Sequence, residues 1–483
     1  MRVLLVPRIE CVDGANSLTI CPTMLMRAWL ELDPNCSFVL PVHENFADPS
    51  WLANYYFTPE QIERVWLLPL SKKVLGNKPT ARRIRNVVGN ALLERLGPTT
   101  PNGQFIDIAI SNGCFASNAS LRCALAGLFG RIMKREIPFI GWAEWVPVHA
   151  WGSGFISPWE VEACLLGAFA ADYVVWQSEV FKQDFVKSLR PIASASALAK
   201  LLEHSEVCQT GIISDKLTLS EYDGKTAPVG MWSGYWKEDF KICVPPLLDA
   251  LKVGALSKVI IQFLKEDVAT LQEEVRRLQA LDNVEVHFRM TQEEYFKLIG
   301  RVHLFATQAV NSPTYGLRWG EAMASGIVPV VCSRIATTFL PDDYPFVVRP
   351  GVKWTEMVIA AARHIRRNPT FGKQVANFVL AEHDFRTAYA KFYMRAEKMV
   401  TAARAQTNYG DFEGIARRVL EGVSEIRHSD AVRAMDKFTT SDASLATSNL
   451  VPPGLLRWAI LEQGFCDDST SWDDPNYARV GDV

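Results

Sequence analysis

The sequence lacks the features that mark membrane-spanning, secreted and metal-binding proteins. Its 483 residues contain no uninterrupted apolar run of about 18 residues, the length that a spanning helix needs. The first ten residues hold too few apolar side chains before Pro7 and Arg8 for the core of a signal peptide. The ten cysteines are scattered, with no C-x-x-C pair and no Cys/His cluster at zinc-ligand spacing. We therefore expect a cytoplasmic protein with reduced thiols, no metal and no transmembrane segment.

The chain also lacks an excess of charge of one sign. Its formal net charge is -2, with 22% charged and 48% apolar residues. This balance is that of a soluble globular enzyme, and it argues against attraction of the whole protein to nucleic acid or membrane. A local basic face is still compatible with it. At this length, two or three domains with their own cores are expected.

Short apolar runs alternate with helical patterns along most of the chain, which predicts parallel strands buried on both faces. In the first half these strands are expected at residues 1–7, 36–42, 105–111, 137–142 and 171–178. After a polar linker, a second series is expected at residues 229–235, 257–264, 283–290, 302–309 and 328–333. The helix after the third strand of this series opens with Thr291 and Glu294, at the spacing of a capping box.

Two such series predict an α/β protein with two doubly wound, Rossmann-like domains that face each other across a cleft. The division is expected near residues 212 to 228, and one long helix is expected over residues 383–406. Ligands of doubly wound sheets bind at the carboxyl ends of the strands. A cleft between two such sheets is therefore the predicted place of the site.

The stretch SPTYGLRWGEAMASGIVPVVCSR, residues 312–334, combines a turn, a short helix and an apolar strand. It follows a predicted strand, so the first turn of its helix should lie at the carboxyl end of the sheet. The unpaired amides of that turn suit an anion such as a diphosphate, and Gly316 lets the backbone approach it closely. Glu321 lies about one turn into the helix, where its carboxylate can accept hydrogen bonds from a vicinal diol such as a ribose.

These residues resemble the nucleotide-binding signature of the family 4 retaining glycosyltransferases of GT-B fold. That signature is a loop ending Gly-Phe-Gly, a Glu-Ala-Met-Ala-x-Gly helix and an apolar strand. Glu321 matches the second Glu of the family's Glu-x7-Glu pair, which binds the donor ribose. The first Glu falls on Pro313 and is missing, which puts the identity of the donor in doubt.

The resemblance extends in order over about residues 1–399. Lys237 fits the family's diphosphate-binding lysine with about a one-residue shift. The arginine with which the family also binds the phosphates falls on Met231. Arg318 or Lys241 would therefore have to contact the phosphates in its place. The segment from residue 284 resembles the family's base-binding segment. The donor-binding residues that the resemblance implies are Gly14, His287, Phe288, Arg289, Thr314, Tyr315, Gly316, Leu317 and Arg318.

The resemblance also implies a domain assignment and a mechanism. Residues 1–212 would hold the acceptor, residues 213–385 the nucleotide sugar, residues 386–437 returning and extra helices, and residues 438–483 a partly flexible extension. A retaining transfer by front-face displacement is implied, in which the departing diphosphate, stabilised by Lys237 and helix amides, takes the acceptor proton. No metal or other cofactor is required by it.

On the amino-terminal side, Glu144 and His149 follow a predicted strand. They are expected to contribute to catalysis from a loop where the family often keeps a sugar- or acceptor-contacting His, although a Trp-rich loop that only packs is an alternative. Asn112 and Asn118 are expected to face the same cleft.

The acceptor half carries a basic segment whose cationic residues are Lys72, Lys73, Lys78, Arg82, Arg83, Arg85 and Arg95. A basic face there would attract a polyanion, either DNA or an anionic lipid surface, although a solvated helix is an alternative. The acceptor therefore stays open between a cell-surface glycan, a lipid-linked or small molecule, and hydroxymethylated bases in DNA, which phage enzymes of GT-B fold modify. The sequence is also compatible with a catalytically silent nucleotide-sugar-binding relative and with a sugar-nucleotide epimerase.

Overall fold

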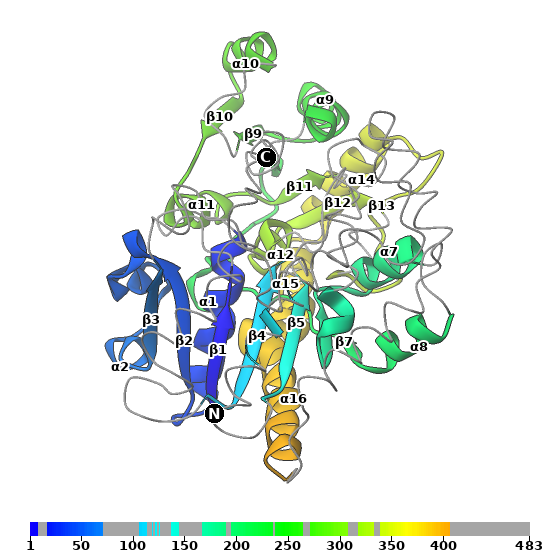
Figure 1. The fold of residues 1–483 in the computed structure, drawn as a ribbon. Coiled ribbons are helices and arrows are strands. Elements are labelled where there is room, and N and C mark those ends of the chain that lie inside the picture. The colour runs from blue at the N-terminus through cyan, green and yellow to red at the C-terminus, as the bar shows by residue number, and fades with distance from the viewer. Residues whose placement is uncertain are drawn as a thin grey trace, which may run out of the picture. The chain divides into compact units, whose positions relative to one another are not determined.

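The chain forms two compact units, which we describe separately (Figure 1). The computed structural model describes residues 1–7, 17–70, 106–113, 118, 121–122, 125, 137–143, 167–189, 195–234, 237–263, 271–307, 317–332 and 339–405. Unit 1 comprises Met1–Cys208 and Ala390–Val483, and unit 2 comprises Gln209–Tyr389. Five cysteines in the described ranges are free thiols: Cys21, Cys36, Cys208, Cys243 and Cys332. Among the described helices, none is long and apolar enough to cross a membrane.

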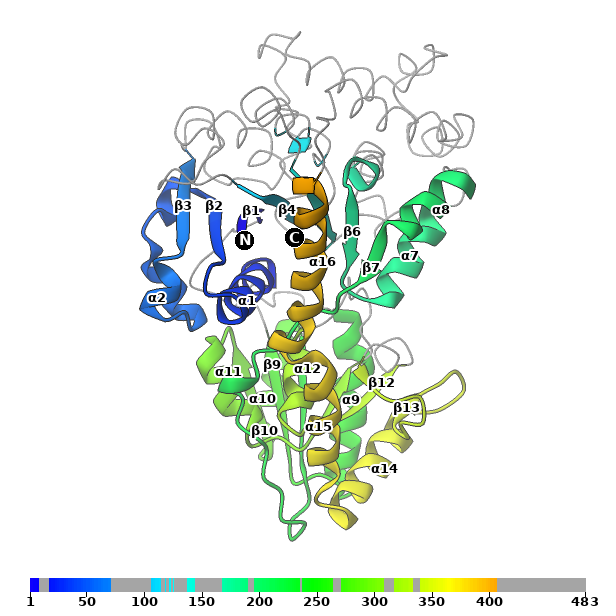
Figure 2. The ribbon, with the colours of Figure 1, turned by 90° about the horizontal axis from the view of Figure 1, so that it is seen from below.

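Unit 1 contains a seven-stranded parallel sheet in the order β3-β2-β1-β4-β5-β6-β7 (Figure 2). The strands are β1 (Arg2–Val6), β2 (Ser37–His43), β3 (Val65–Leu70), β4 (Ile108–Gly113), β5 (Phe139–Ala143), β6 (Tyr173–Trp176) and β7 (Ser205–Val207). Its helices are α1 (Ser17–Leu32), α2 (Pro59–Ile62), α7 (Glu179–Leu189) and α8 (Ala195–Glu203), with 3-10 turns η1 (Glu44–Phe46) and η2 (Pro49–Tyr55). Strands β2 and β5 are buried along their whole length, because a parallel sheet is covered on both faces.

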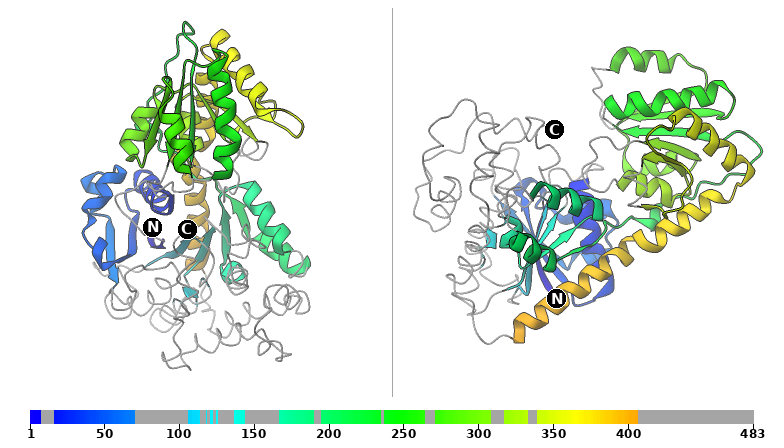
Figure 3. Two further views of the ribbon diagram at one scale, coloured as in Figure 1. Left: turned by 90° about the horizontal axis from the view of Figure 1, so that it is seen from above. Right: turned by 90° about the vertical axis from the view of Figure 1, so that its right-hand side faces the viewer.

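Unit 2, drawn in green to yellow in Figure 3, contains a six-stranded parallel sheet. Its strand order is β10-β9-β8-β11-β12-β13. The strands are β8 (Val229–Gly234), β9 (Lys258–Phe263), β10 (Val284–Phe288), β11 (Leu304–Thr307), β12 (Val328–Cys332) and β13 (Val347–Val348). The helices are α9 (Lys237–Lys252), α10 (Gln272–Gln279), α11 (Gln292–Ile299), α12 (Leu317–Ala324), α14 (Trp354–Arg367) and α15 (Phe371–His383), after a 3-10 turn η4 (Ser214–Lys216). The two sheets confirm the predicted doubly wound fold.

The two faces of the unit 2 sheet are covered by different helices. Helix α9 packs on the face that carries Trp232 and Phe263: the ring of Phe240 lies 5.3 Å from that of Trp232 and 5.6 Å from that of Phe263. Arg318 of α12 reaches Ser233 and Gln262, which alternate with those residues along their strands. Because successive side chains of a strand point to opposite faces, α12 covers the other face.

The capping box predicted before α11 is present. The backbone N–H of Glu294 donates to Thr291 Oγ1 at 3.2 Å, and the backbone N–H of Thr291 donates to Glu294 Oε2 at 2.8 Å. Two unpaired backbone donors at the helix start are satisfied in this way. The boundary of α11 is therefore set by local sequence.

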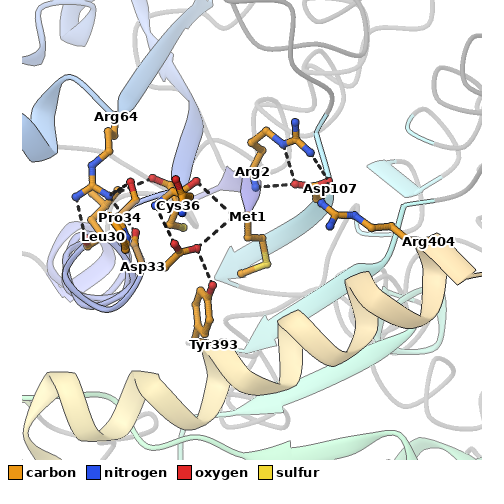
Figure 4. A network of polar contacts seen from close by, with 11 residues as sticks. Met1, Arg2, Leu30, Asp33, Pro34, Cys36, Arg64, Asp107, Tyr393 and Arg404 are labelled. Carbon is orange, nitrogen blue, oxygen red and sulfur yellow. Dashed lines mark hydrogen bonds and ion pairs between the residues drawn. The ribbon is translucent and has the colours of Figure 1, made fainter.

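Helix α16 (Phe385–Ala405) contributes its residues from Ala390 onward to unit 1. Tyr393 donates to Asp33 Oδ2 at 2.7 Å, and Arg404 donates to Asp107 Oδ1 at 2.6 Å (Figure 4). Arg2 adds three hydrogen bonds to the fully buried Asp107 side chain, two from its guanidinium at 2.8 and 2.9 Å and one from its backbone N–H at 2.9 Å. Burial alone would raise the pKa of Asp107, but the hydrogen bonds from Arg2 and Arg404 outweigh it and lower that pKa. The late helix thus completes a unit that begins some 400 residues earlier along the chain.

Candidate functional site

The order of the unit 2 sheet places the candidate site at the carboxyl ends of β8 and β11. Strands β8 and β11 are neighbours, and successive strands move away from them in opposite directions. At such a switch point the two following loops diverge and leave a crevice, where doubly wound proteins bind their ligands. Here α9 follows β8 and α12 follows β11, and the two helices cover opposite faces of the sheet.

Arg318 lies over the ends of two strands of this sheet. Its Nη1 donates to Gln262 Oε1 at 2.8 Å and to Ser233 Oγ at 3.3 Å. The hydroxyl of Ser233 also donates to Gln262 Oε1. On the other side, the guanidinium carbon lies 5.1 Å from the centre of the Tyr295 ring, whose hydroxyl donates to the Arg318 carbonyl at 3.1 Å. The second residue of α12 is thus fixed to the carboxyl ends of β8 and β9.

Glu321, one turn further along α12, is a buried acid among polar groups. Its relative exposure is 4%. Burial raises the pKa of its carboxyl to about 7, against a lowering by the charge of Arg318. Burial and the charge of Glu321 raise the pKa of the nearby Tyr295. A strongly shifted acid beside a cation at a switch point is a candidate functional group.

The remaining residues of α12 serve packing. Met323 and Ala324 are almost fully buried. A Cβ atom at Gly320 would lie 2.7 Å from Ile212 Cδ1 and 3.0 Å from a ring carbon of Phe339, so these side chains would have to shift to admit a larger residue there. The motif therefore combines tightly packed small residues with one acid that packing does not require.

The first turn of α9 is fixed by a second acid, Asp239. This buried carboxylate accepts hydrogen bonds from Trp232 Nε1 at 2.8 Å and from Thr307 Oγ1 at 3.4 Å. These partners belong to β8 and β11, the two strands of the switch point. Lys237 is the first residue of α9, two positions before Asp239, although its side chain lies outside the described residues. Lys241 is exposed on the next turn of the helix.

Met231, on which the family's arginine falls, is a core residue. It pairs in register with Ile260 in the middle of β8 and is 2% exposed. The carboxyl end of that strand is formed by Ser233 and Gly234. A side chain at position 231 therefore packs in the core rather than at the end of the strand.

The predicted base-binding residues lie at the carboxyl end of β10, beside β9. His287 pairs in register with Gln262, and its Nε2 lies 3.2 Å from Glu285 Oε2. Phe288 stacks on Phe263, with ring centres 5.4 Å apart and an interplanar angle of 13°. Arg289 follows with a positive φ of 36°, and its backbone N–H donates to the carbonyl of Phe263. The three residues and Arg318 thus share one edge of the same sheet.

The remaining residues predicted for the site are either buried or lie outside the described part of the chain. Asn112 and Asn118 are fully buried, and Asn118 Nδ2 donates to the carbonyl of Gly167 at 3.4 Å, so their expected exposure to a cleft is wrong. The following residues lie outside the described part of the chain: Gly14, Lys72, Lys73, Arg82, Arg83, Arg85, Glu144, His149, Thr314, Tyr315 and Gly316. Within the described ranges, no group of three or more His, Cys, Asp or Glu side chains could hold a metal ion.

Sequence reasoning missed Ser233, Gln262 and Asp239. A signal for two of them was present, because Ser233 and Gln262 are polar residues near the ends of otherwise apolar strands, where a fully buried sheet has little use for them. Their meeting with Arg318 depends on strand order.

No family profile matches this chain, and no curated protein matches it by sequence. Solved structures are nevertheless similar to it. HepE of Anabaena, in complex with UDP and glucose, has a TM-score of 0.53 at 14% identity, over 82% of this chain and 100% of that one. Sucrose-phosphate synthase of Thermosynechococcus elongatus has a TM-score of 0.57 at 11% identity, over 83% and 100%. The catalytic domain of starch synthase IV of Arabidopsis thaliana, bound to ADP and acarbose, has a TM-score of 0.55 at 11% identity, over 83% and 99%. The fold of the chain is the GT-B fold of these glycosyltransferases.

Proposed function

We propose that the chain is a glycosyltransferase that takes its sugar from a nucleotide-sugar donor held by unit 2. The observation that carries the proposal is the arrangement on α12, where Arg318 and Glu321 lie one turn apart at the switch point of a sheet in a GT-B fold. A nucleotide sugar offers a diphosphate to a cation and a ribose diol to a carboxylate. The two side chains supply both partners at helical spacing.

In this proposal Glu321 accepts hydrogen bonds from the ribose hydroxyls in its ionised form. Its burial excludes competing water, which strengthens each hydrogen bond to the charged group. The same burial raises the pKa of the carboxyl to about 7, so that the acid is poised between its two protonation states near neutral pH. The diphosphate is assigned to Arg318, to the first-turn amides of α12 and to Lys237.

We propose retention of configuration at the transferred sugar, because the resemblance to family 4 implies front-face displacement. The leaving diphosphate then needs stabilisation of its developing charge, which cations and helix amides provide. No metal is assigned a role. The expected cytoplasmic location goes with this proposal.

The acceptor is proposed to bind unit 1. The basic segment that contains Arg82, Arg83 and Arg85 favours a polyanionic acceptor, with DNA and an anionic lipid surface as the two candidates. Mass spectrometry of DNA and of lipid extracts from cells that express the protein would separate them by showing which one gains a hexose or pentose.

The first experiment measures binding and hydrolysis of UDP-, ADP- and GDP-sugars by the full chain. We expect turnover of at least one donor, and a loss of its binding in Glu321→Ala without a loss of the fold. The presence of Pro313 in place of the first family Glu gives a specific alternative, a silent relative that binds a donor without turning it over. Clear binding with no turnover in the presence of DNA and lipid acceptors would favour that alternative, and no binding at all would refute the proposal.

A further inference from the structure

Helix α11 contacts α12 through Tyr295 and Arg318. The Tyr295 hydroxyl donates to the carbonyl of Arg318 at 3.1 Å, and the Arg318 guanidinium carbon lies 5.1 Å from the centre of the Tyr295 ring. Gln292 precedes Tyr295 by three residues on α11, and Glu321 follows Arg318 by three residues on α12. Residues three apart lie on one face of a helix, so Gln292 and Glu321 belong to the two faces that meet.

The side-chain amide of Gln292 is a donor without an acceptor. Its Nε2 is shielded from solvent and makes no hydrogen bond in the part of the chain that the structure describes. The amide lies beside the carboxyl of Glu321 and lowers its pKa, but its geometry falls short of a hydrogen bond. A buried donor that makes no hydrogen bond destabilises the folded protein, so its presence beside a buried acid calls for an explanation other than stability.

A ligand hydroxyl would complete both groups at once. A hydroxyl has one proton to donate and two lone pairs that accept. It can therefore donate to the ionised carboxylate of Glu321 and accept from Nε2 of Gln292. An anionic ligand group would be repelled by Glu321, and a cationic group would offer no acceptor to Gln292. A neutral hydroxyl is thus the ligand group that fits this pair of side chains.

We propose that Gln292 donates to one hydroxyl of the donor ribose while Glu321 accepts from the ribose diol. The pair then selects donors with an intact diol, such as UDP-, ADP- or GDP-sugars, over deoxythymidine diphosphate sugars. This inference rests on the proposed function, and it deepens it by naming the nucleoside class of the donor and a second residue that recognises it. Gln292 contributes the donor that a carboxylate lacks, so the diol is held from two helices.

The test removes the donor atom of Gln292 and, separately, each hydroxyl of the ligand. Gln292→Met keeps the length of the side chain and has no N–H. Its control, Gln374→Met, makes the same change on the exposed surface of α15 in the same unit. Calorimetry measures binding of UDP, ADP and GDP to the full-length chain. It then measures the 2′-deoxy and 3′-deoxy forms of the one that the wild type binds most tightly.

The wild type should bind the ribonucleotide about tenfold or more tightly than either deoxy form, the range for hydrogen bonds to a charged group. Gln292→Met should weaken binding of the ribonucleotide by about threefold to tenfold, the range for a neutral hydrogen bond. Its affinity for one of the two deoxy forms should match that of the wild type, because that form already lacks the hydroxyl that Gln292 contacts. Glu321→Gln should instead reduce the discrimination against both deoxy forms, and Gln374→Met should bind as the wild type does.

The pattern of losses separates the possible roles of Gln292. An equal loss of affinity for all three ligands would overturn the inference, since Gln292 would then act on Glu321 rather than on a hydroxyl. Unchanged affinity of Gln292→Met for the ribonucleotide would overturn it as well. Either result leaves the proposed function standing, because the nucleotide still binds, whereas a wild type that binds none of the diphosphates overturns the proposed function itself. If Gln292→Met does not fold by circular dichroism, Gln292→Ala is measured in its place and judged by the same pattern.

Discussion

Replacing Glu321 by glutamine should stabilise unit 2 at high pH. The carboxyl has an ordinary pKa of 4.5 and a pKa of about 7 in the folded protein, because it is buried. The folded state therefore binds the proton more tightly than the unfolded state, so the free energy of unfolding falls as the pH rises from 4.5 to about 7. At about 1.4 kcal/mol per pKa unit, this rise corresponds to about 3 kcal/mol above pH 7.

Glutamine has nearly the same shape as glutamic acid but does not titrate. The fall in the free energy of unfolding with rising pH should therefore disappear in Glu321→Gln. We expect similar stability for variant and wild type near pH 4, and a variant more stable by about 3 kcal/mol at pH 8. Urea unfolding at several pH values measures the difference, with Glu382→Gln on the exposed surface of α15 as the control. The same pH dependence in Glu321→Gln and in the wild type would refute the claim that this acid is buried at a cost.

The raised pKa of Glu321 should also make donor binding depend on pH. If the ionised carboxylate accepts the ribose hydroxyls, wild-type affinity for the bound nucleotide sugar should rise with pH through about 7, because deprotonation then precedes binding. Glu321→Gln should bind weakly at all pH values. A flat pH profile for the wild type would count against the ribose role and leave the stability prediction intact.

Three further predictions concern packing, ion pairs and the acceptor. Gly320→Ala should destabilise unit 2 by up to about 2 kcal/mol in urea unfolding, because its Cβ would meet Ile212 Cδ1 at 2.7 Å and the higher helix propensity of alanine offsets only part of the resulting strain. Asp107→Ala should cost about 1–3 kcal/mol in unit 1, since it removes the buried carboxylate that accepts from Arg2 and Arg404, which are themselves partly exposed; a change under about 0.5 kcal/mol would contradict this. Charge reversal at Arg82, Arg83 and Arg85 should abolish acceptor binding while donor hydrolysis persists, and acceptor use that survives at both high and low salt would exclude a polyanion.

Edge strands were the part of the two sheets that the sequence pattern predicted least well. The sequence pattern did not predict β3, β7 or β13. It did predict every described strand that has a neighbouring strand on both sides, and the predicted residues overlap the observed ones. β3 and β7 end the unit 1 sheet and β13 ends that of unit 2, and their residues are largely half-buried. An edge strand needs fewer apolar residues because one side of it has no neighbouring strand, so its pattern is weaker. β10 was found, although it is also an edge strand, because it alternates and precedes a capping box.

Helix α9 shows tertiary packing prevailing over local preference. Pro245 and Pro246 lie in its interior, where each removes a backbone donor and favours a break. The helix continues because Val244, Leu247 and Ala250 are almost fully buried on the side that faces the sheet. Burial of these side chains outweighs the lost hydrogen bonds.

Local sequence was enough to predict the two parallel sheets, the boundary of α11 and the choice of Glu321 as a candidate. Each of these depends on residues close together in the chain: an apolar run, a capping pair or one short motif. Only the assembled fold reveals that Ser233, Gln262 and Arg318 meet, and that Asn112 and Asn118 are fully buried. Strand order brings together groups that are 29 to 85 residues apart, and no local pattern encodes that order.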